Sequence, residues 1–292
     1  SLFKGLRDTD VVHIMANSGW SWHLFAAPAI WIAKMKGKPV VLNYRGGYAK
    51  TFFDKSWFWV KPSMQRCDKV IVPSVFLQEV FEEFSCQADI VPNVLDQKNF
   101  YSNEREIATQ APHLIVTRNL EQIYDVDTAI RAFHIVQQRY PQAKLSVAGT
   151  GPELDNLKAL TKTLNIKERV SFVGRLSPTE IADLYRSADV MINTSVVDNS
   201  PNSLIEALAC GTPVVSTNVG GIPKLVTDQH DAILVEPEQP EAVAAGIIKV
   251  LEDAEFCDKI RTNGMSTVSK FFWSNVWQRL KEHYHEAAVK TQ

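Results

Sequence analysis

Cysteine is scarce and scattered in this chain of 292 residues. Its four cysteines, Cys67, Cys86, Cys210 and Cys257, form no C-x-x-C pair, and no histidine lies at metal-ligand spacing from any of them. Isolated thiols of this kind predict small buried or incidental side chains in a reducing compartment. We therefore expect a cytoplasmic protein without a bound metal ion.

Long apolar runs and an excess of charge are also lacking. No apolar stretch approaches the roughly 20 residues of a membrane-spanning helix, and the opening SLFKGLRDTD has no signal-peptide core. The formal net charge is −2, and no lysine-arginine block stands out, which disfavours nucleic acid as a partner. With 45% apolar and 22% charged residues, the composition is typical of a soluble globular protein.

Short β-branched runs alternate with longer helical stretches in two successive sets, which is typical of parallel α/β domains. The expected strands of the first set are 10–15, 39–43, 69–72 and 89–91, and those of the second are 113–117, 144–148, 170–173, 189–194, 213–217 and 232–236. The polar segment 96–111 between the sets predicts a linker. We expect a first domain over 1–96 and a second over 112–271. The helix of 272–292 should pack back on the first domain through Trp273, Trp277 and Leu280.

The stretch DNSPNSLIEALACGTP, residues 198 to 213, follows one expected strand and precedes another. Ser200 and Pro201 predict the N-cap and first residue of a helix that Gly211 ends. In such a unit the loop and the helix start face a ligand crevice, where free N–H groups attract an anion. Glu206 should point away from the buried stripe, which comprises Leu204, Ile205 and Leu208. Taken alone, Asp198 and Glu206 are also compatible with two ordinary surface acids.

Three motifs together carry a family resemblance. They are VGRLSP at 173–178, DNSPNSLIEALACGTPVVS at 198–216 and NVGGIP at 218–223. They resemble the retaining glycosyltransferases of the two-Rossmann GT-B architecture, family 4. The resemblance implies two doubly wound parallel-sheet domains, a nucleotide-diphosphate sugar as co-substrate, a glycan or lipid-linked acceptor, and no metal or other cofactor.

Site residues follow from the resemblance, position by position. It implies that Glu206 holds the ribose of the donor, that Asp198 lies near the transferred sugar, and that Arg118 binds the diphosphate. An arginine suits that role because its planar fork neutralises phosphate charge. The other implied donor-binding residues are Asn119, Gly149, Gly151, Val173, Gly174, Arg175, Asn199, Ser200, Pro201, Asn202, Ser203, Gly220 and Gly221. On the acceptor side the implied residues are Arg45, Gly46 and Gly47.

The chain departs from the family pattern at several places. Asp198 stands where relatives carry a glutamate, and Ile123 stands where they carry a lysine that helps to bind the diphosphate. Tyr124, or the helix amides around Asn202 and Ser203, are the candidates to compensate for that lysine. Arg45 follows a tyrosine where relatives often show His-Gly. Relatives also carry an extra stretch before residue 1, so we expect the first domain to be incomplete.

Three further patterns have two interpretations each. Asp125-Val-Asp127 has the spacing of a cation site, but acids at a helix start are better explained by capping. Gly149-Thr-Gly151 fits either a tight strand-to-helix turn or a close approach to phosphate. The aromatic and lysine residues of 52–61 fit either a peripheral membrane contact or a packed core.

The sequence therefore predicts a retaining glycosyltransferase that transfers a hexose in polysaccharide or glycolipid biosynthesis. One alternative is a nucleotide-sugar epimerase of the same architecture, which would need acid and base groups on both sides of the sugar. Another is a donor-binding protein without catalysis, suggested by the missing lysine and the short first domain.

Overall fold

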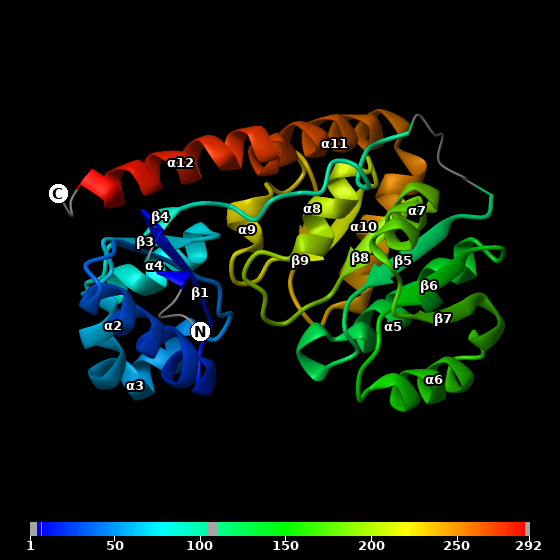
Figure 1. Cartoon of the computed structure of the whole chain (residues 1–292). Helices are drawn as coiled ribbons and strands as arrows, with labels where there is room; N and C mark the ends of the chain where they lie inside the picture. Colours follow the sequence, from blue (N-terminus) through cyan, green and yellow to red (C-terminus); the bar gives the residue numbers. More distant parts are fainter. Residues whose placement is uncertain (1–4, 7, 104–109, 290–292) are drawn as a thin grey trace. The chain divides into compact units, whose positions relative to one another are not determined.

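The chain folds into two compact α/β units, each described here by itself (Figure 1). In this computed structural model, residues 5–6, 8–103 and 110–289 are described. Unit 1 comprises Ser1–Val94 and Trp273–Gln292, and unit 2 comprises Leu95–Phe272. Both are built on parallel sheets, which confirms the predicted fold class.

Unit 1 is built on a four-stranded parallel sheet with the order β1-β2-β3-β4. Its strands are β1 (Val12–Ala16), β2 (Val40–Tyr44), β3 (Lys69–Val72) and β4 (Asp89–Ile90). Its helices are η1 (Trp22–Ala26), α2 (Ala27–Met35), α3 (Ala49–Met64), α4 (Val75–Glu83) and α12 (Trp273–Val289). The strand order runs in one direction, so the described part of this sheet has no point at which the order reverses. The Rossmann crevice that such a reversal creates is therefore found only in unit 2.

Helix α12 packs on the sheet of unit 1, but only partly through the residues that the sequence suggested. Val276 and Ala287 are buried against a cluster that contains Val41, Ile71 and Val91. Trp273 and Trp277 stack on each other instead and remain 52% and 41% exposed. The buried stripe of α12 is thus offset from the predicted one, and of the predicted residues only Leu280 packs against this cluster.

The aromatic segment 52–61 lies on α3 and is divided between core and surface. Phe52 and Phe53 are buried, and Trp57 packs against the same cluster, which supports the core interpretation for these three rings. Phe58 and Trp59 are 78% and 70% exposed. A membrane contact stays a prediction, and only for the last two rings. Among the described residues, none of the helices is long and apolar enough to span a bilayer.

Unit 2 has six parallel strands in the order β10-β9-β8-β5-β6-β7. They are β5 (His113–Thr117), β6 (Lys144–Ala148), β7 (Val170–Gly174), β8 (Val190–Asn193), β9 (Val214–Thr217) and β10 (Ile233–Val235). The helices are η2 (Gln122–Tyr124), α5 (Val126–Arg139), α6 (Leu154–Thr163), η3 (Lys167–Arg169), α7 (Pro178–Ser187), α8 (Asn202–Ala209), α9 (Ile222–Leu225), α10 (Pro240–Glu252), α11 (Ala254–Thr267) and η4 (Val268–Phe271). This is the doubly wound order, in which the sheet winds outward in both directions from β5 and β8.

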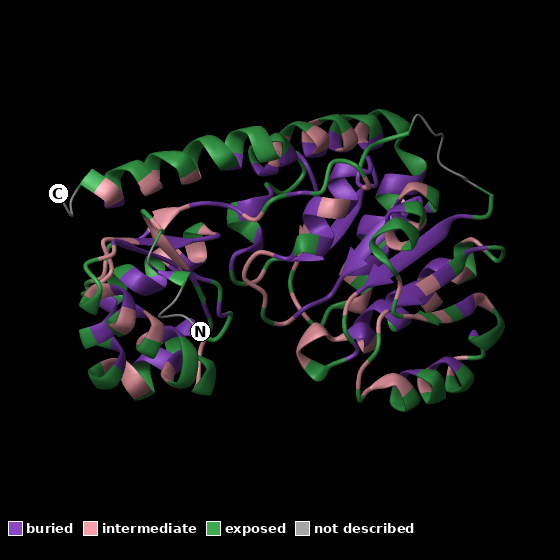
Figure 2. Ribbon diagram, in the orientation of Figure 1, coloured by how far each residue is buried: buried purple, intermediate pink, exposed green. Residues whose placement is uncertain are grey.

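Alternate residues of the strands of unit 2 enter two separate cores. Leu114 and Val116 of β5 join a cluster with α5 and α10 on one face, whereas Ile115 joins a cluster with α7 and α8 on the other. Figure 2 shows the resulting buried strands between helices with exposed outer faces. Helix α7 begins with a capping box, in which Ser177 and Glu180 each satisfy the other's backbone N–H. Burial on both faces explains why these strands are continuous apolar runs in the sequence.

The polar segment 96–111 is only partly a linker. Phe100, like the preceding Leu95, is buried in the core of unit 2, and Arg186 donates a hydrogen bond to the carbonyl of Asn99 over 2.6 Å. The first residues of the segment therefore belong to unit 2. Residues 104–109 lie outside the described residues.

Candidate functional site

The candidate site lies at the carboxyl ends of β5 and β8, where the strand order of unit 2 reverses. Chain segments leave these two neighbouring strands toward opposite sides of the sheet, which opens a crevice between their loops. Arg118 directly follows β5, and Asp198 lies in the loop that connects β8 to α8. The topology therefore brings together two of the three residues that were predicted to act on the donor.

Arg118 is held by contacts from three different elements. Its Nη2 atom lies 2.6 Å from the Oδ2 atom of Asp198, and its Nη1 atom donates to the hydroxyl of Ser203 over 3.3 Å. Its guanidinium group lies over the ring of Tyr124, 4.1 Å from the centroid. The Nε atom is buried and has no hydrogen-bond partner among the described residues. The two hydrogen bonds use two of the five N–H groups of the guanidinium group, so Arg118 is oriented by its neighbours and still has N–H groups to offer to an anion.

Asp198 is largely buried beside this arginine. Burial raises the pKa of its carboxyl group, whereas Arg118 and the backbone N–H of Asn199 act in the opposite direction. The hydrogen bond from Asn199 to the Oδ1 atom is 2.9 Å long. Both carboxylate oxygens therefore have partners, so the side chain of Asp198 is fixed in one orientation.

Two glycines, Gly149 and Gly220, lie in close contact with the backbone carbonyl groups of Arg118 and Asp198. A Cβ atom at Gly149 would lie 1.9 Å from the carbonyl oxygen of Arg118, and one at Gly220 would lie 2.0 Å from that of Asp198. Gly220 also has a φ of +53°, and the next amide, that of Gly221, donates to the carbonyl of Asp198 over 3.0 Å. A Cβ at Gly151 would likewise collide with the carbonyl of Leu120, at 2.2 Å. The turn interpretation of Gly149 and Gly151 is therefore sufficient to explain both glycines.

Glu206 is linked to the end of β5 through hydrogen bonds of Tyr185. Its Oε2 atom accepts a hydrogen bond of 3.3 Å from the hydroxyl of Tyr185, which lies 2.8 Å from the hydroxyl of Thr117 at the end of β5. Burial raises the pKa of Glu206 to about 7, although the hydrogen bond from Tyr185 lowers it. The predicted buried stripe of α8 is confirmed, and Glu206 itself is half-buried. Sequence patterns do not indicate a role for Tyr185 or Thr117, because neither belongs to a motif and their hydrogen bond links positions 68 residues apart.

Buried polar side chains cover the sheet end beneath Asp198. Asn193 donates to the hydroxyl of Ser216 over 3.0 Å, and the hydroxyl of Ser195 donates to the Oδ1 atom of Asn193 over 2.9 Å. Ser195 also hydrogen-bonds Asp198 and lowers the pKa of that residue. Polar groups this deep are stable only when they are paired, so the network fixes the loop that carries Asp198.

Helix α8 starts one residue later than predicted. Its first residue is Asn202, and Pro201 is the N-cap with a ψ of 117°, outside the helical range. The prediction placed proline inside the helix because its φ suits the first turn, but φ alone does not fix ψ. No side chain at the N-cap accepts a hydrogen bond from the first turn. The start of α8 lies beside Arg118, because the hydroxyl of Ser203 is bonded to it.

The segment that follows Arg118 carries Ile123 at the position where the resemblance implies a lysine. Ile123 accepts a hydrogen bond of 2.9 Å from the amide of Val196 through its carbonyl, so it anchors the loop and supplies no charge. The neighbouring Tyr124 stacks on Arg118. Asp125 is the N-cap of α5 and accepts from the amide of Thr128, as the capping interpretation predicted. The partner of Asp127 is Arg131, one turn along the same helix.

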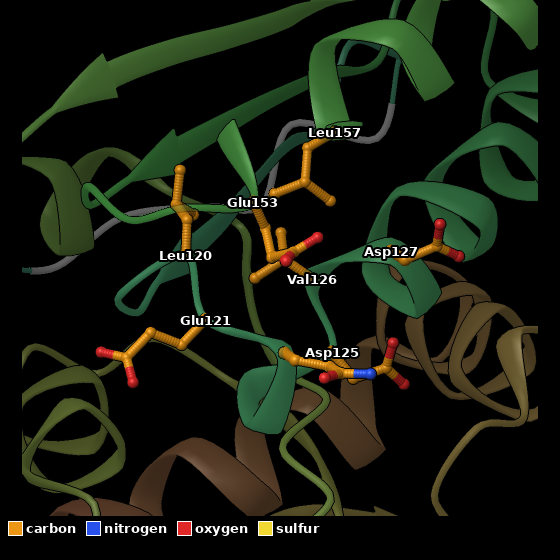
Figure 3. A pocket seen from close by; sticks show the side chains of 8 residues that line it. Leu120, Glu121, Asp125, Val126, Asp127, Glu153 and Leu157 are labelled. Atoms are coloured by element: carbon orange, nitrogen blue, oxygen red, sulfur yellow. The ribbon is translucent and has the colours of Figure 1, made fainter. Parts of the chain in front are cut away.

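A small acidic pocket is lined in part by residues of this segment (Figure 3). It has a volume of about 80 Å³ and is lined by Leu120, Glu121, Gln122, Asp125, Val126, Asp127, Glu153 and Leu157. Ligand pockets for molecules of drug size are roughly 300–1,000 Å³. This pocket is therefore too small for a nucleotide sugar, and it contains none of the predicted donor residues. No group of acids, histidines or cysteines among the described residues is arranged to hold a metal ion.

The remaining predicted residues are less tightly joined to the ion pair. Gly174 accepts from the amide of Gly149 over 2.8 Å, which places the turn after β7 beside that after β6, and its neighbours Val173 and Arg175 are exposed. Asn119 is exposed and bonded to Glu121. Ser200 lies in the β8–α8 connection, and Asn202 is the exposed first residue of α8.

The predicted acceptor-side residues lie in unit 1. Arg45 follows β2 and is bonded to the side chain of Asn93, and its amide donates to the carbonyl of Ala16 over 2.9 Å. Gly46 leaves no room for a side chain, because a Cβ atom would lie 2.5 Å from the hydroxyl oxygen of Ser18. Gly47 has room for a side chain, because nothing lies within 4 Å of the position that its Cβ would occupy. Their role toward an acceptor stays a prediction.

Several known proteins are similar to this chain in sequence or in fold. An uncharacterised glycosyltransferase of Methanocaldococcus jannaschii is 34% identical over 152 residues, which are 52% of this chain and 39% of that protein. The N-acetyl-alpha-D-glucosaminyl L-malate synthase of Bacillus anthracis is 30% identical over 172 residues, 56% of this chain and 44% of that protein. The match thus spans less than half of either relative. The crystal structure of Anabaena HepE in complex with UDP has a TM-score of 0.81 at 19% identity, over 96% of this chain and 80% of that chain.

One family model covers most of unit 2. The model for glycosyl transferases group 1 matches residues 97–267, which contain Arg118, Asp198 and Glu206. These residues include the strands of the doubly wound sheet from β5 to β10 and the crevice at its centre. The chain therefore belongs to the family of group 1 glycosyltransferases.

Proposed function

We propose that unit 2 binds a nucleoside-diphosphate sugar and that the protein transfers the hexose, with retention of configuration, to a glycan or lipid-linked acceptor. The observation that carries the proposal is the Arg118–Asp198 pair at the point where the strand order reverses, with Glu206 tied to the same strand end. Anabaena HepE, which has a similar fold, binds UDP. Membership of the group 1 family supports the same reaction class.

The arrangement supplies the groups that such a donor needs. The diphosphate would be bound by the remaining N–H groups of Arg118 and by the amides at the start of α8, where the helix dipole favours an anion. The ribose would bind to the carboxylate of Glu206, whose two oxygens can each accept a hydroxyl.

Charge stabilisation is the chemistry that these residues can perform. When the bond to the sugar breaks, negative charge develops on the leaving diphosphate, and a pre-oriented guanidinium group stabilises it without reorganisation. Asp198 and Tyr124 fix the plane of that guanidinium group, from its edge and from its face. We assign no protein nucleophile. The proposed enzyme therefore works by orientation and electrostatics, and its reaction needs no redox cofactor.

The donor can be identified with a panel of UDP-, GDP- and ADP-glucose in thermal-shift measurements. One of the three should stabilise the wild-type protein, because a ligand that binds only the folded state raises Tm. In the variant Glu206→Ala we expect affinity to fall about tenfold to a hundredfold, since the ribose loses charge-assisted hydrogen bonds. Glu168→Ala is the matched control, because the side chain of Glu168 is 90% exposed. An unchanged shift in Glu206→Ala would place the ribose elsewhere.

A further inference from the structure

We infer that Tyr185 is a positioning residue for the donor: its hydroxyl group holds the carboxyl group of Glu206 toward the carboxyl end of β5. The inference rests on the proposed function, because it assigns a role to Tyr185 in binding the ribose. It adds a residue from α7, an element that contributes none of the predicted site residues.

Tyr185 carries its hydroxyl group through the core. The side chain is fully buried in the cluster between α7 and α8, and its ring makes an edge contact with Phe100 at 6.2 Å. A ring that served only to fill this space would be better as phenylalanine, because an unpaired buried hydroxyl group is costly. Here the hydroxyl is paired twice, with Thr117 and with Glu206. Packing alone does not explain the hydroxyl group of Tyr185, whereas its two hydrogen bonds do.

The directions of the two hydrogen bonds follow from the chemistry of the three groups. An ionised carboxylate can only accept, so the Tyr185 hydroxyl donates to Glu206, and the Thr117 hydroxyl then donates to Tyr185. Burial raises the pKa of Tyr185 well above its usual value, so the phenol keeps its proton at every pH at which the protein is studied. The chain from Thr117 to Glu206 therefore stabilises the ionised form of Glu206, which is the form that accepts two ribose hydroxyls.

The change of UDP affinity with pH that we expect from Glu206 can be distinguished from the effects of other titratable groups near it. Cys210, at the end of α8, interacts with Glu206, but burial raises the pKa of its thiol to about 12. Arg186 of α7 interacts with Cys210 and lowers the pKa of that thiol, against the larger effect of burial. Asp198 is the one further acid of the site with a raised pKa, and it is bonded to Arg118. A comparison of the wild type with Glu206→Gln separates the titration of Asp198 from that of Glu206.

The test is the pH dependence of UDP binding, measured by calorimetry from pH 5.5 to 8.5. For the wild type we expect affinity to fall below about pH 7, up to tenfold per pH unit, as Glu206 is protonated. Loss of the hydrogen bond in Tyr185→Phe should raise the midpoint by about half to one pH unit and weaken binding about threefold to tenfold at pH 6. Thr117→Val should produce a smaller shift in the same direction.

Two controls separate positioning from folding. Tyr140→Phe also removes a tyrosine hydroxyl bonded to a glutamate, Glu252, but outside the candidate site, so it should leave the midpoint unchanged. In Glu206→Gln the part of the pH dependence that is due to Glu206 should disappear, and adding Tyr185→Phe to it should change UDP affinity by less than twofold. A folded Tyr185→Phe protein with the wild-type midpoint would overturn the inference. If the wild type binds UDP but Tyr185→Phe is unfolded, the Thr117→Val midpoint decides: no shift overturns the inference. If the thermal-shift panel identifies GDP or ADP as the nucleotide, the same titration is carried out with that diphosphate. If the wild type binds none of the three diphosphates at any pH, the proposed function fails and this inference fails with it.

Discussion

Arg118→Gln should weaken UDP binding by about 30- to 100-fold and leave the binding of uridine, which has no phosphates, nearly unchanged. The reason is that the guanidinium group lies at the carboxyl end of β5 bonded to Asp198, and charge-assisted hydrogen bonds to phosphate are the strongest that such a site can make. The rate of sugar transfer should fall further, by about 10²–10³, because charge on the leaving diphosphate is greatest in the transition state. Calorimetry with the two ligands measures the first effect.

The same substitution leaves Asp198 largely buried without its cation. The side chains of the pair are only 12% and 10% exposed, so Arg118→Gln should also cost stability, by roughly 3 kcal/mol. The double variant Arg118→Gln with Asp198→Asn should recover much of that stability but not the affinity for UDP. Arg131→Gln is the matched control, since it breaks an exposed pair with Asp127 on α5. A double variant that binds UDP like the wild type would show that Arg118 has a structural role only.

Gly149→Ala and Gly220→Ala should be among the most destabilising single substitutions in unit 2. Each adds a methyl group about 2 Å from a backbone carbonyl oxygen, which must move because a backbone atom cannot rotate away as a side chain does. We expect a cost of roughly 3 kcal/mol each, which corresponds to a fall in Tm of about 6–12 °C for a domain of this size. Thermal unfolding followed by circular dichroism measures it.

Gly174→Ala separates the steric effect from the backbone effect. Gly174 has a φ of +73°, but nothing lies within 4 Å of the position that its Cβ would occupy. Its substitution should cost only the left-handed strain, about 1 kcal/mol. Gly220→Ala should cost clearly more stability than Gly174→Ala, although both glycines have a positive φ. Equal losses for the two variants would mean that the contact with the carbonyl of Asp198 does not constrain the site.

Local patterns in the sequence predict the elements of this fold well. The strands over 69–72, 113–117 and 144–148 have the bounds that the β-branched runs predict, because strands buried on both faces are continuous apolar runs between polar residues. Local patterns do less well where two dihedral angles must both be known. Pro201 fixes φ but leaves ψ free, so the start of α8 differs from the prediction.

The site itself depends on pairings that no local pattern contains. Arg118 and Asp198 are 80 residues apart, and only the strand order places β5 beside β8. The motif resemblance predicts both residues but not that they bind each other. Tyr185 lies outside every motif, and its hydroxyl has a role only because α7 and β5 are neighbours in the fold. Sequence reasoning therefore finds the chemically obvious residues and misses those that orient them.

The most direct test of the account is a crystal structure of the protein with UDP bound. The account predicts the ribose hydroxyls within hydrogen-bond distance of Glu206 and a phosphate oxygen within hydrogen-bond distance of Arg118, next to the first turn of α8. A UDP molecule bound in unit 2 with its ribose away from Glu206, or with its phosphates away from Arg118, would contradict it.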